Sequence, residues 1–282
     1  MSLATSFESI YFSELDSTNE EARRRLLSAA ITVPTVISAG MQTRGRGSRG
    51  RVWASPLGKG LYFSIVHPAP GVLSLKHPAL SKQNPIFDAD WSFFTRTAGL
   101  ACALVLQQEI GLDIQLKPVN DLYLQGRKLG GILCESIFGE AGASLLSHLS
   151  HQGNLPQYVF PLNAGSSLYA CKGIITGIGI NLRQSVEVED FCQAEERLPV
   201  LENTSTGFID PVQGVNQPIS LEEALPPAIF AQWLNRGEEL ILNHLVQTIT
   251  AEVDSLYQRL LWEAGFVDIL LEKTAAIQFH SS

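Results

Sequence analysis

Between residues 42 and 56 the chain reads QTRGRGSRGRVWASP. Four arginines fall within eight residues of this stretch, interleaved with glycines, and no acidic residue lies between Gly40 and Gly60. Glycine lets backbone N–H groups approach a ligand closely, and guanidinium groups hold oxyanions through paired hydrogen bonds. The stretch therefore indicates an anion site. A solvated basic loop would share its arginines and glycines, but such a loop has no need of Trp53.

The charge of the whole chain indicates that this basic character is local. The 282 residues carry a net charge of −8, whereas the segment from Gly40 to Gly60 carries +5. The remainder of the chain is strongly acidic, which argues against a general nucleic-acid binder.

Residues 45–50 also fit the GxGxxG pattern of dinucleotide-binding sites. Such a site needs a helix directly after the glycines and an acidic residue about twenty positions further on. Here the loop leads into residues 60–66, GLYFSIV, which predict a strand, and the next acidic residue is Asp88. This context excludes a Rossmann site.

Outward from the loop, the sequence predicts an α+β fold with a mixed β-sheet and helices rather than alternating βαβ units. Apolar residues make up 45% of the chain and charged residues 17%, which is enough for a folded core. Ser17 and Glu20 have the spacing of a capping box at the start of a helix. Strands are expected at residues 10–12, 35–39, 60–66, 112–116, 122–124, 129–135 and 173–182, helices at 91–109 and 226–263, and loops at 139–172 and 195–225.

The cysteines and the N-terminus indicate a cytoplasmic protein. The cysteines have no CxxC spacing and no histidine partners at zinc-finger intervals, so reduced thiols are expected and no metal site. No signal or transit pattern opens the chain, and no apolar stretch is long and unbroken enough to cross a membrane. The cysteines are Cys102, Cys134, Cys171 and Cys192.

The basic loop resembles the signature of biotin protein ligases, Q-x-x-GRGRxGRxWxSP followed by G-x-x-LYxS. Three further blocks agree in order and spacing. Residues 16–19 resemble the family's DSTN, residues 117–122 and 126–133 (KPVNDL and GRKLGGIL) resemble KWPNDL and GRKLxGIL, and residues 177–182 (GIGINL) resemble GIGxN. Together the blocks cover residues 7–185, and four collinear blocks are a specific signal.

The resemblance implies a catalytic domain over residues 1–265, with the class II aminoacyl-tRNA synthetase-like fold of biotin–lipoate ligases. It implies a short tail at 266–282 without the family's C-terminal SH3-like barrel, and no N-terminal winged helix. The implied activity joins biotin and ATP, with Mg²⁺, into biotinyl-5'-AMP, and then transfers biotin to a lysine of a biotin carboxyl carrier domain. A non-catalytic biotin- or nucleotide-binding relative is the alternative. A lipoate–protein ligase is disfavoured, since those enzymes lack this loop.

The resemblance also assigns residues to roles. Lys117 and Arg46 are the expected catalytic cations. The biotin site is expected to comprise Ser17, Thr18, Asn19, Gln42, Arg46, Gly47, Ser48, Lys117 and Gly131, and the ATP site Arg49, Arg51, Trp53, Asn120 and Asn181. From the residues alone, Ser17 or Thr18 could instead cap a helix, Trp53 could anchor the loop, Asn181 could end a strand, and Lys117 could pair with Asp121.

The chain departs from the family pattern at two places in these blocks. Ser48 stands where the family has arginine, which predicts a weaker grip on the adenylate. Pro118 and Val119 stand where the family has tryptophan and proline, which changes the backbone next to Lys117.

Overall fold

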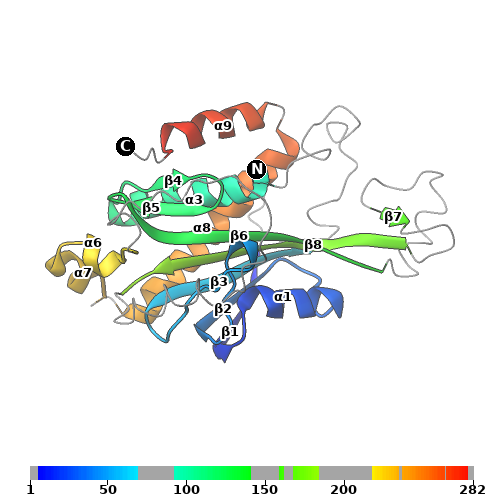
Figure 1. Ribbon diagram of the computed structural model, residues 1–282, viewed down its shortest axis with the longest axis horizontal. Coiled ribbons are helices and arrows are strands. Elements are labelled where there is room, and N and C mark those ends of the chain that lie inside the picture. The colour runs from blue at the N-terminus through cyan, green and yellow to red at the C-terminus, as the bar shows by residue number, and fades with distance from the viewer. Residues whose placement is uncertain are drawn as a thin grey trace, which may run out of the picture.

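The computed structural model describes residues 6–68, 92–140, 159–161, 168–183, 218–234, 237–263 and 265–278. Their centre is an eight-stranded sheet in the order β1-β2-β3-β8-β6-β5-β4, with β7 pairing β8 (Figure 1). The β1–β2 pair is parallel, whereas the other pairs are antiparallel, so the predicted mixed sheet is confirmed. The strands are β1 (Glu8–Leu15), β2 (Thr35–Gln42), β3 (Gly60–Pro68), β4 (Gln115–Lys117), β5 (Asp121–Leu124), β6 (Arg127–Glu140), β7 (Val159–Pro161) and β8 (Leu168–Asn181).

Helices cover both faces of this sheet. On one face α1 packs against β2, β3, β6 and β8, and on the other α3 and α8 pack together, with α9 beside them (Figure 1). The helical elements are α1 (Thr18–Leu27), the 3₁₀ turn η1 (Ser48–Gly50), α3 (Ser92–Ile110), α6 (Leu221–Ala224), α7 (Pro227–Leu234), α8 (Glu238–Trp262) and α9 (Phe266–Ala276). The α+β fold predicted from the sequence is confirmed.

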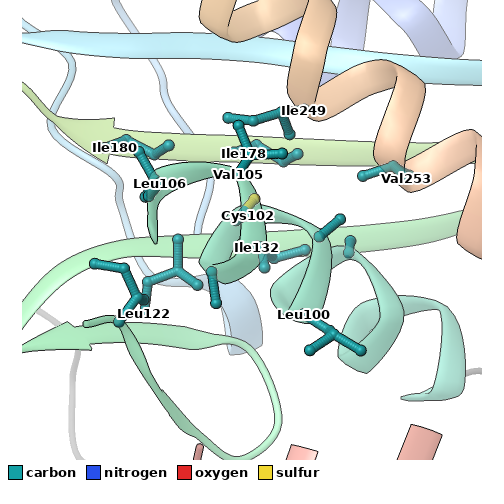
Figure 2. Packing of buried hydrophobic residues seen from close by; sticks show 14 of the residues in the cluster. Leu100, Cys102, Val105, Leu106, Leu122, Ile132, Ile178, Ile180, Ile249 and Val253 are labelled. Atoms are coloured by element: carbon teal, nitrogen blue, oxygen red, sulfur yellow. The ribbon is translucent and has the colours of Figure 1, made fainter. Parts of the chain in front are cut away.

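The main hydrophobic core lies between the sheet and the layer of α3 and α8. Figure 2 shows side chains of α3 and α8 converging on Ile132, Ile178 and Ile180 of the sheet. A smaller cluster, which includes Ala22 and Ile175, lies under α1 on the opposite face. Among the described helices only α1 packs on that second face, and it leaves room there for the candidate site.

Some predicted elements have different bounds in the structure. The strand expected at residues 112–116 is only Gln115–Lys117, because Leu112 and Ile114 are buried as part of the connection from α3. The loop expected at 139–172 is wrong at its ends, since β6 extends to Glu140 and β8 begins at Leu168. Within that loop, Val159–Pro161 pairs with β8, and the rest lies outside the described residues.

The C-terminal third is more helical than expected. The loop predicted at 195–225 ends in α6, whose Leu221 is fully buried; residues 195–217 lie outside the described part of the chain. The tail expected from residue 266 begins with α9, which contributes Phe266 and Leu270 to the main core. Both segments bury apolar side chains that a short sequence window cannot distinguish from those of a loop.

Candidate functional site

Strand β8 places side chains of very different size on its two faces. Ile178 and Ile180 point into the main core and are almost fully buried. The residues that alternate with them, Gly177 and Gly179, therefore face the α1 side of the sheet. Gly131 of β6 pairs with Gly179, and with Gly177 these glycines form a floor that carries no side chain of its own. It is bordered by Leu133, which pairs with Gly177.

Two side chains lie directly on this glycine floor. A Cβ atom at Gly179 would lie 2.5 Å from Trp53 Nε1, and one at Gly131 would lie 3.3 Å from the same indole ring. A Cβ atom at Gly177 would lie 2.2 Å from Asn19 Oδ1. The glycines are therefore required by close contact with Trp53 and Asn19.

The amide of Asn19 is held in one orientation by its neighbours. Its Nδ2 donates to Leu133 O at 3.2 Å and to Glu135 Oε2 at 2.8 Å, while its Oδ1 accepts from Ser64 Oγ at 2.6 Å. Both amide hydrogens are thereby used, and one lone pair of Oδ1 is left for a ligand. Asn19 and Ser64 are buried, so these bonds are shielded from water.

The glutamine that opens the basic loop caps helix α1. Thr18 N donates to Gln42 Oε1 at 2.8 Å, and Gln42 Nε2 donates to Ser55 Oγ at 2.8 Å. Ser17 occupies the N-cap position, but its side chain makes no capping bond. The capping box expected from the sequence is therefore wrong. The Glu20 carboxylate pairs with Arg46, and Gln42 instead accepts the first N–H of the helix, that of Thr18.

The basic loop folds back on itself as a small hairpin. Trp53 N donates to Gly45 O at 2.8 Å, and Gly47 N donates to Arg51 O at 2.8 Å. A Cβ atom at Gly45 would lie 2.1 Å from Trp53 O, so only glycine allows this closure. The hairpin seats Trp53 on the sheet.

The arginines of the loop have different surroundings. Arg46 forms ion pairs with Glu20 of α1 and with Glu135 of β6. Arg49 is exposed and makes no side-chain hydrogen bond or ion pair with the described residues. Only Arg46 is therefore fixed to other elements of the fold.

Ser48 links the loop to the turn between β4 and β5. Its Oγ accepts from Arg51 Nη2 at 3.1 Å and from Asn120 Nδ2 at 3.4 Å. Arg51 also donates through Nε to Ser48 O at 3.4 Å. A guanidinium therefore lies beside the hydroxyl at position 48, although it comes from residue 51.

Two lysines lie on strands near the glycine floor, Lys117 at the end of β4 and Lys128 near the start of β6. Lys117 Nζ lies 3.3 Å from Tyr123 Oη, whereas the carboxylate of Asp121 is 2.8 Å from Lys128 Nζ. The alternative that Lys117 pairs with Asp121 is therefore not what the structure shows. Lys128 Nζ also lies 5.3 Å from the centre of the Trp53 ring, within range of a cation–π contact.

Asn181 serves a different segment. Its Nδ2 donates to Ile219 O at 3.1 Å, and Arg127 donates to Pro218 O at 2.7 Å, so both side chains hold the segment that precedes α6. This segment lies at the end of β8, next to the site but not on the glycine floor.

The structure thus joins most of the predicted site residues through direct contacts. The joined residues are Thr18, Asn19, Gln42, Arg46, Trp53 and Gly131, together with the separate contact of Ser48, Arg51 and Asn120. Within the described part of the chain, the side chains of Ser17, Arg49, Lys117 and Asn181 make no hydrogen bond to either group.

Sequence reasoning missed four polar side chains at the site: Glu20, Ser64, Lys128 and Glu135. Ser64 and Lys128 lie inside the matched blocks LYFS and GRKLGGIL, so the blocks already contained them. Glu135 carried a physical signal, because it is the one charged residue in the otherwise uncharged run from Leu129 to Gly139. A charge in such a run costs free energy unless it has partners.

Residues 11–149 match the biotin/lipoate A/B protein ligase family. The chain is 35% identical over 129 residues to the bifunctional ligase/repressor BirA of Escherichia coli, and 31% identical over 121 residues to the biotin–[acetyl-CoA-carboxylase] ligase of Paracoccus denitrificans.

Residues 11–149 of this chain are therefore a segment of the biotin/lipoate A/B protein ligase type.

The similarity to these family members is confined to part of each protein. It covers 45% of this chain and 34% of the E. coli protein, and 43% of this chain and 44% of the P. denitrificans protein. The chain therefore spans less than half the length of the curated relatives that it matches.

Solved structures from the family share the fold. A biotin protein ligase of Aquifex aeolicus, in complex with biotin and ATP, has a TM-score of 0.56 at 19% identity, over 96% of this chain and 78% of the other. A biotin protein ligase of Leishmania major in complex with biotin has a TM-score of 0.51 at 16% identity, over 98% of this chain and 84% of the other. The mixed sheet with its two helical layers is therefore the catalytic-domain fold of biotin protein ligases.

No helix in the described ranges has the length and apolar character needed to cross a membrane.

Burial raises the pKa of the Cys102 and Cys134 thiols, and raises that of Cys171 to about 11, so these three are protonated at neutral pH. Cys192 lies outside the described residues.

The first residue of the DSTN block stabilises the start of α1. Arg24 donates two hydrogen bonds to the Asp16 carboxylate, at 2.7 and 2.8 Å, and this lowers the pKa of Asp16 from 3.8 to about 2. A carboxyl whose pKa is lowered by folding contributes stability above its unfolded pKa and loses it as the pH falls through the folded pKa. The contribution of Asp16 is therefore complete above about pH 4 and absent below about pH 2.

We expect Asp16→Asn to lower the free energy of unfolding at pH 7 by less than about 1 kcal/mol, because the pair is exposed. Urea denaturation of both proteins at pH 7 and pH 3 measures this difference, which should shrink at pH 3. A difference that is independent of pH would contradict an ionic role for Asp16.

Proposed function

We propose that this protein is a biotin protein ligase, which activates biotin with ATP and then transfers it to a lysine of a biotin carboxyl carrier domain. The observation that carries this proposal is the glycine floor of Gly131, Gly177 and Gly179, bounded by a polar network at one end and by cations at the other. The glycines allow the thin bicyclic ring of biotin to approach the sheet closely, beside the Trp53 indole that lies on Gly131 and Gly179. The two ends suit its ureido group and its carboxylate.

The polar end supports recognition of the ureido group. Asn19 has no amide hydrogen left for a ligand, but its Oδ1 retains a free lone pair. It can therefore accept a hydrogen bond from a ureido N–H, while Thr18 and Gln42 complete this end of the site. A ligand without an N–H or O–H group at this position would leave that buried oxygen lone pair without a partner, and it should therefore bind more weakly.

The cationic end supports the first chemical step. A carboxylate oxygen of biotin attacks the α-phosphorus of ATP, the bond from that phosphorus to the bridging oxygen of the β-phosphate breaks, and pyrophosphate leaves. Negative charge builds on the phosphate oxygens, so fixed cations provide most of the catalysis. We assign this role to Arg46 and Lys117, with Lys128 added because it lies against Trp53.

The second step transfers the biotinyl group. The Nζ atom of a lysine on the carrier domain attacks the acyl carbon of biotinyl-5'-AMP, AMP leaves, and the attacking amine loses a proton. In our proposal Arg49, Arg51, Trp53, Asn120 and Asn181 hold the nucleotide during both steps. A magnesium ion would bind through phosphate oxygens of the nucleotide, as Mg²⁺ usually does.

Biotin-dependent exchange of labelled pyrophosphate into ATP tests the first step directly. Exchange that requires biotin supports the proposal, and exchange that requires lipoate instead would identify a lipoate–protein ligase. Binding of biotin without any exchange would identify a non-catalytic relative. Transfer to an isolated carrier domain tests the second step separately.

We expect Ser48→Arg to slow the release of biotinyl-5'-AMP. Ser48 is neutral where the family pattern has arginine, so one cation that could hold the adenylate is missing. Restoring it adds one charge-assisted hydrogen bond, which corresponds to about 1.5–3 kcal/mol, or roughly a ten- to hundred-fold slower release. The measurement is biotinylation of bystander proteins by the wild type and by Ser48→Arg at matched rates of adenylate formation.

Released adenylate acylates lysines without recognising the carrier domain, so wild-type protein should label bystanders more strongly than Ser48→Arg. Equal and weak labelling by both proteins would contradict the prediction. It would mean that Arg51, which already donates to Ser48, supplies the missing cation.

A further inference from the structure

Arg46 is held by two carboxylates from different parts of the fold. Its Nη1 contacts Oε1 of Glu20 on α1, and its Nη2 lies 3.0 Å from Oε1 of Glu135 on β6. The guanidinium therefore connects the basic loop, the first turn of α1 and the centre of the sheet. We call these three side chains the carboxylate clamp.

The clamp gives the ligand-free site an unfavourable charge for an anionic substrate. Two carboxylates and one guanidinium sum to a net charge of −1, at the position where the loop would otherwise present a cation. An incoming carboxylate or phosphate that binds the two terminal nitrogens of Arg46 must compete there with Glu20 and Glu135. We propose that Glu20 and Glu135 are positioning residues, which hold Arg46 in the empty site and release it to the substrate anion. This inference rests on the proposed function for the identity of that anion.

The two carboxylates differ in what else they hold. Within the described residues, the Glu20 carboxylate forms a hydrogen bond and ion pair only with Arg46, and its side chain is 33% exposed. Glu135 is 17% exposed, and its second oxygen accepts the Asn19 amide at 2.8 Å. Glu135 therefore also fixes the orientation in which Asn19 presents its oxygen to a ligand. Neutralising the two residues should accordingly change biotin affinity in opposite directions.

Glu21 provides a matched control on the same helix turn. It is adjacent to Glu20 in sequence and also forms ion pairs, but its partners are Arg24 and Arg25 rather than Arg46. Glu21→Gln removes the same charge from the same helix without touching the clamp. Glu20→Gln, Glu135→Gln and Glu21→Gln thus form one series.

The first measurement needs no ligand. Limited digestion with trypsin reports how often the loop between Arg44 and Arg51 opens in the empty protein. We expect Glu20→Gln and Glu135→Gln to increase cleavage there roughly two- to five-fold, the effect of losing one partly exposed ion pair, and Glu21→Gln to leave it unchanged. Arg46→Gln, which releases the loop from the other side of the clamp, should increase cleavage at Arg44, Arg49 and Arg51 to a similar extent.

The second measurement is calorimetric titration of each variant with biotin. Glu20→Gln should bind biotin about two- to five-fold more tightly, because a competing charge is removed. Glu135→Gln should bind it roughly tenfold more weakly, because its amide can donate to Asn19 and no longer fixes the orientation of that side chain. A general loss of structure would weaken binding in both variants and cannot produce the opposite signs.

The outcomes separate the clamp from the proposed function. Unchanged cleavage in Glu20→Gln, Glu135→Gln and Arg46→Gln would overturn the clamp, whether or not the wild type makes biotinyl-5'-AMP. Increased cleavage in these variants, in a protein that neither binds biotin nor exchanges pyrophosphate, would support the clamp and refute the proposed function. Weaker biotin binding by Glu20→Gln would overturn the proposal that this carboxylate competes with the substrate.

Discussion

Alanine at position 117 is expected to lower biotin-dependent ATP–pyrophosphate exchange by about 100-fold or more, which is the usual loss when one charge-stabilising group leaves an active site. Biotin affinity should change by less than about tenfold, or ~1.4 kcal/mol. The reason for the difference is that negative charge at the phosphates develops only during the reaction. Exchange kinetics and calorimetry of Lys117→Ala measure the two effects separately.

Lys128→Ala tests whether Lys128, rather than Lys117, is the lysine that stabilises the phosphate charge. Lys128 contacts the Trp53 ring and Asp121, whereas Lys117 is exposed and contacts Tyr123. Lys273→Ala is the control, since it removes an exposed lysine from α9 on the opposite side of the sheet. Normal exchange by Lys117→Ala together with strongly reduced exchange by Lys128→Ala would transfer the catalytic role to Lys128.

Valine at position 179 is expected to weaken biotin binding by about 100-fold or more, or ~2.7 kcal/mol. Even a single Cβ atom at this position would lie 2.5 Å from Trp53 Nε1, so the larger side chain must displace the indole and fill the glycine floor. The cost to folding should be smaller, roughly 1–3 kcal/mol, which is the usual range when side-chain volume is added at a packed position. Calorimetric titration with biotin and thermal unfolding measure the two effects.

Gly139→Val is the matched control for this prediction. Gly139 is a glycine of the same sheet, but a Cβ atom there would meet Lys172 and Leu27 rather than Trp53. Gly131→Ala should have an intermediate effect, since its Cβ atom would lie 3.3 Å from the indole. Unchanged biotin affinity in Gly179→Val would mean that the ligand does not use the floor.

The sequence predicted those elements whose side-chain pattern depends on local geometry. The strand at residues 173–182 was expected from its continuous apolar character, and the structure shows why glycine alternates with isoleucine there. One face of β8 needs bulk for the core, and the other must accept Trp53 and Asn19. The mixed sheet and the long helices could also be predicted, because the apolar side chains of their segments follow local strand or helix patterns.

Elements that depend on distant contacts were not predicted. Helix α9 was expected to be a short tail, because its burial depends on α3 and α8, which a local window does not include. Ser17 was a candidate cap, but the cap comes from Gln42, 24 residues away. Glu135 was missed because its partners Asn19 and Arg46 are more than 80 positions distant in the chain.

The cap that Gln42 provides couples the local unfolding of the basic loop to that of helix α1. Thr18 is buried, so its N–H group has no water to bond when the Gln42 side chain withdraws. Any opening that removes Gln42 therefore also frays the first turn of α1, and the two segments form one cooperative unit of local unfolding. Amide hydrogen exchange at Thr18 should consequently follow the movements of the basic loop, and a ligand that slows exchange in the loop should slow exchange at the start of this helix by the same factor.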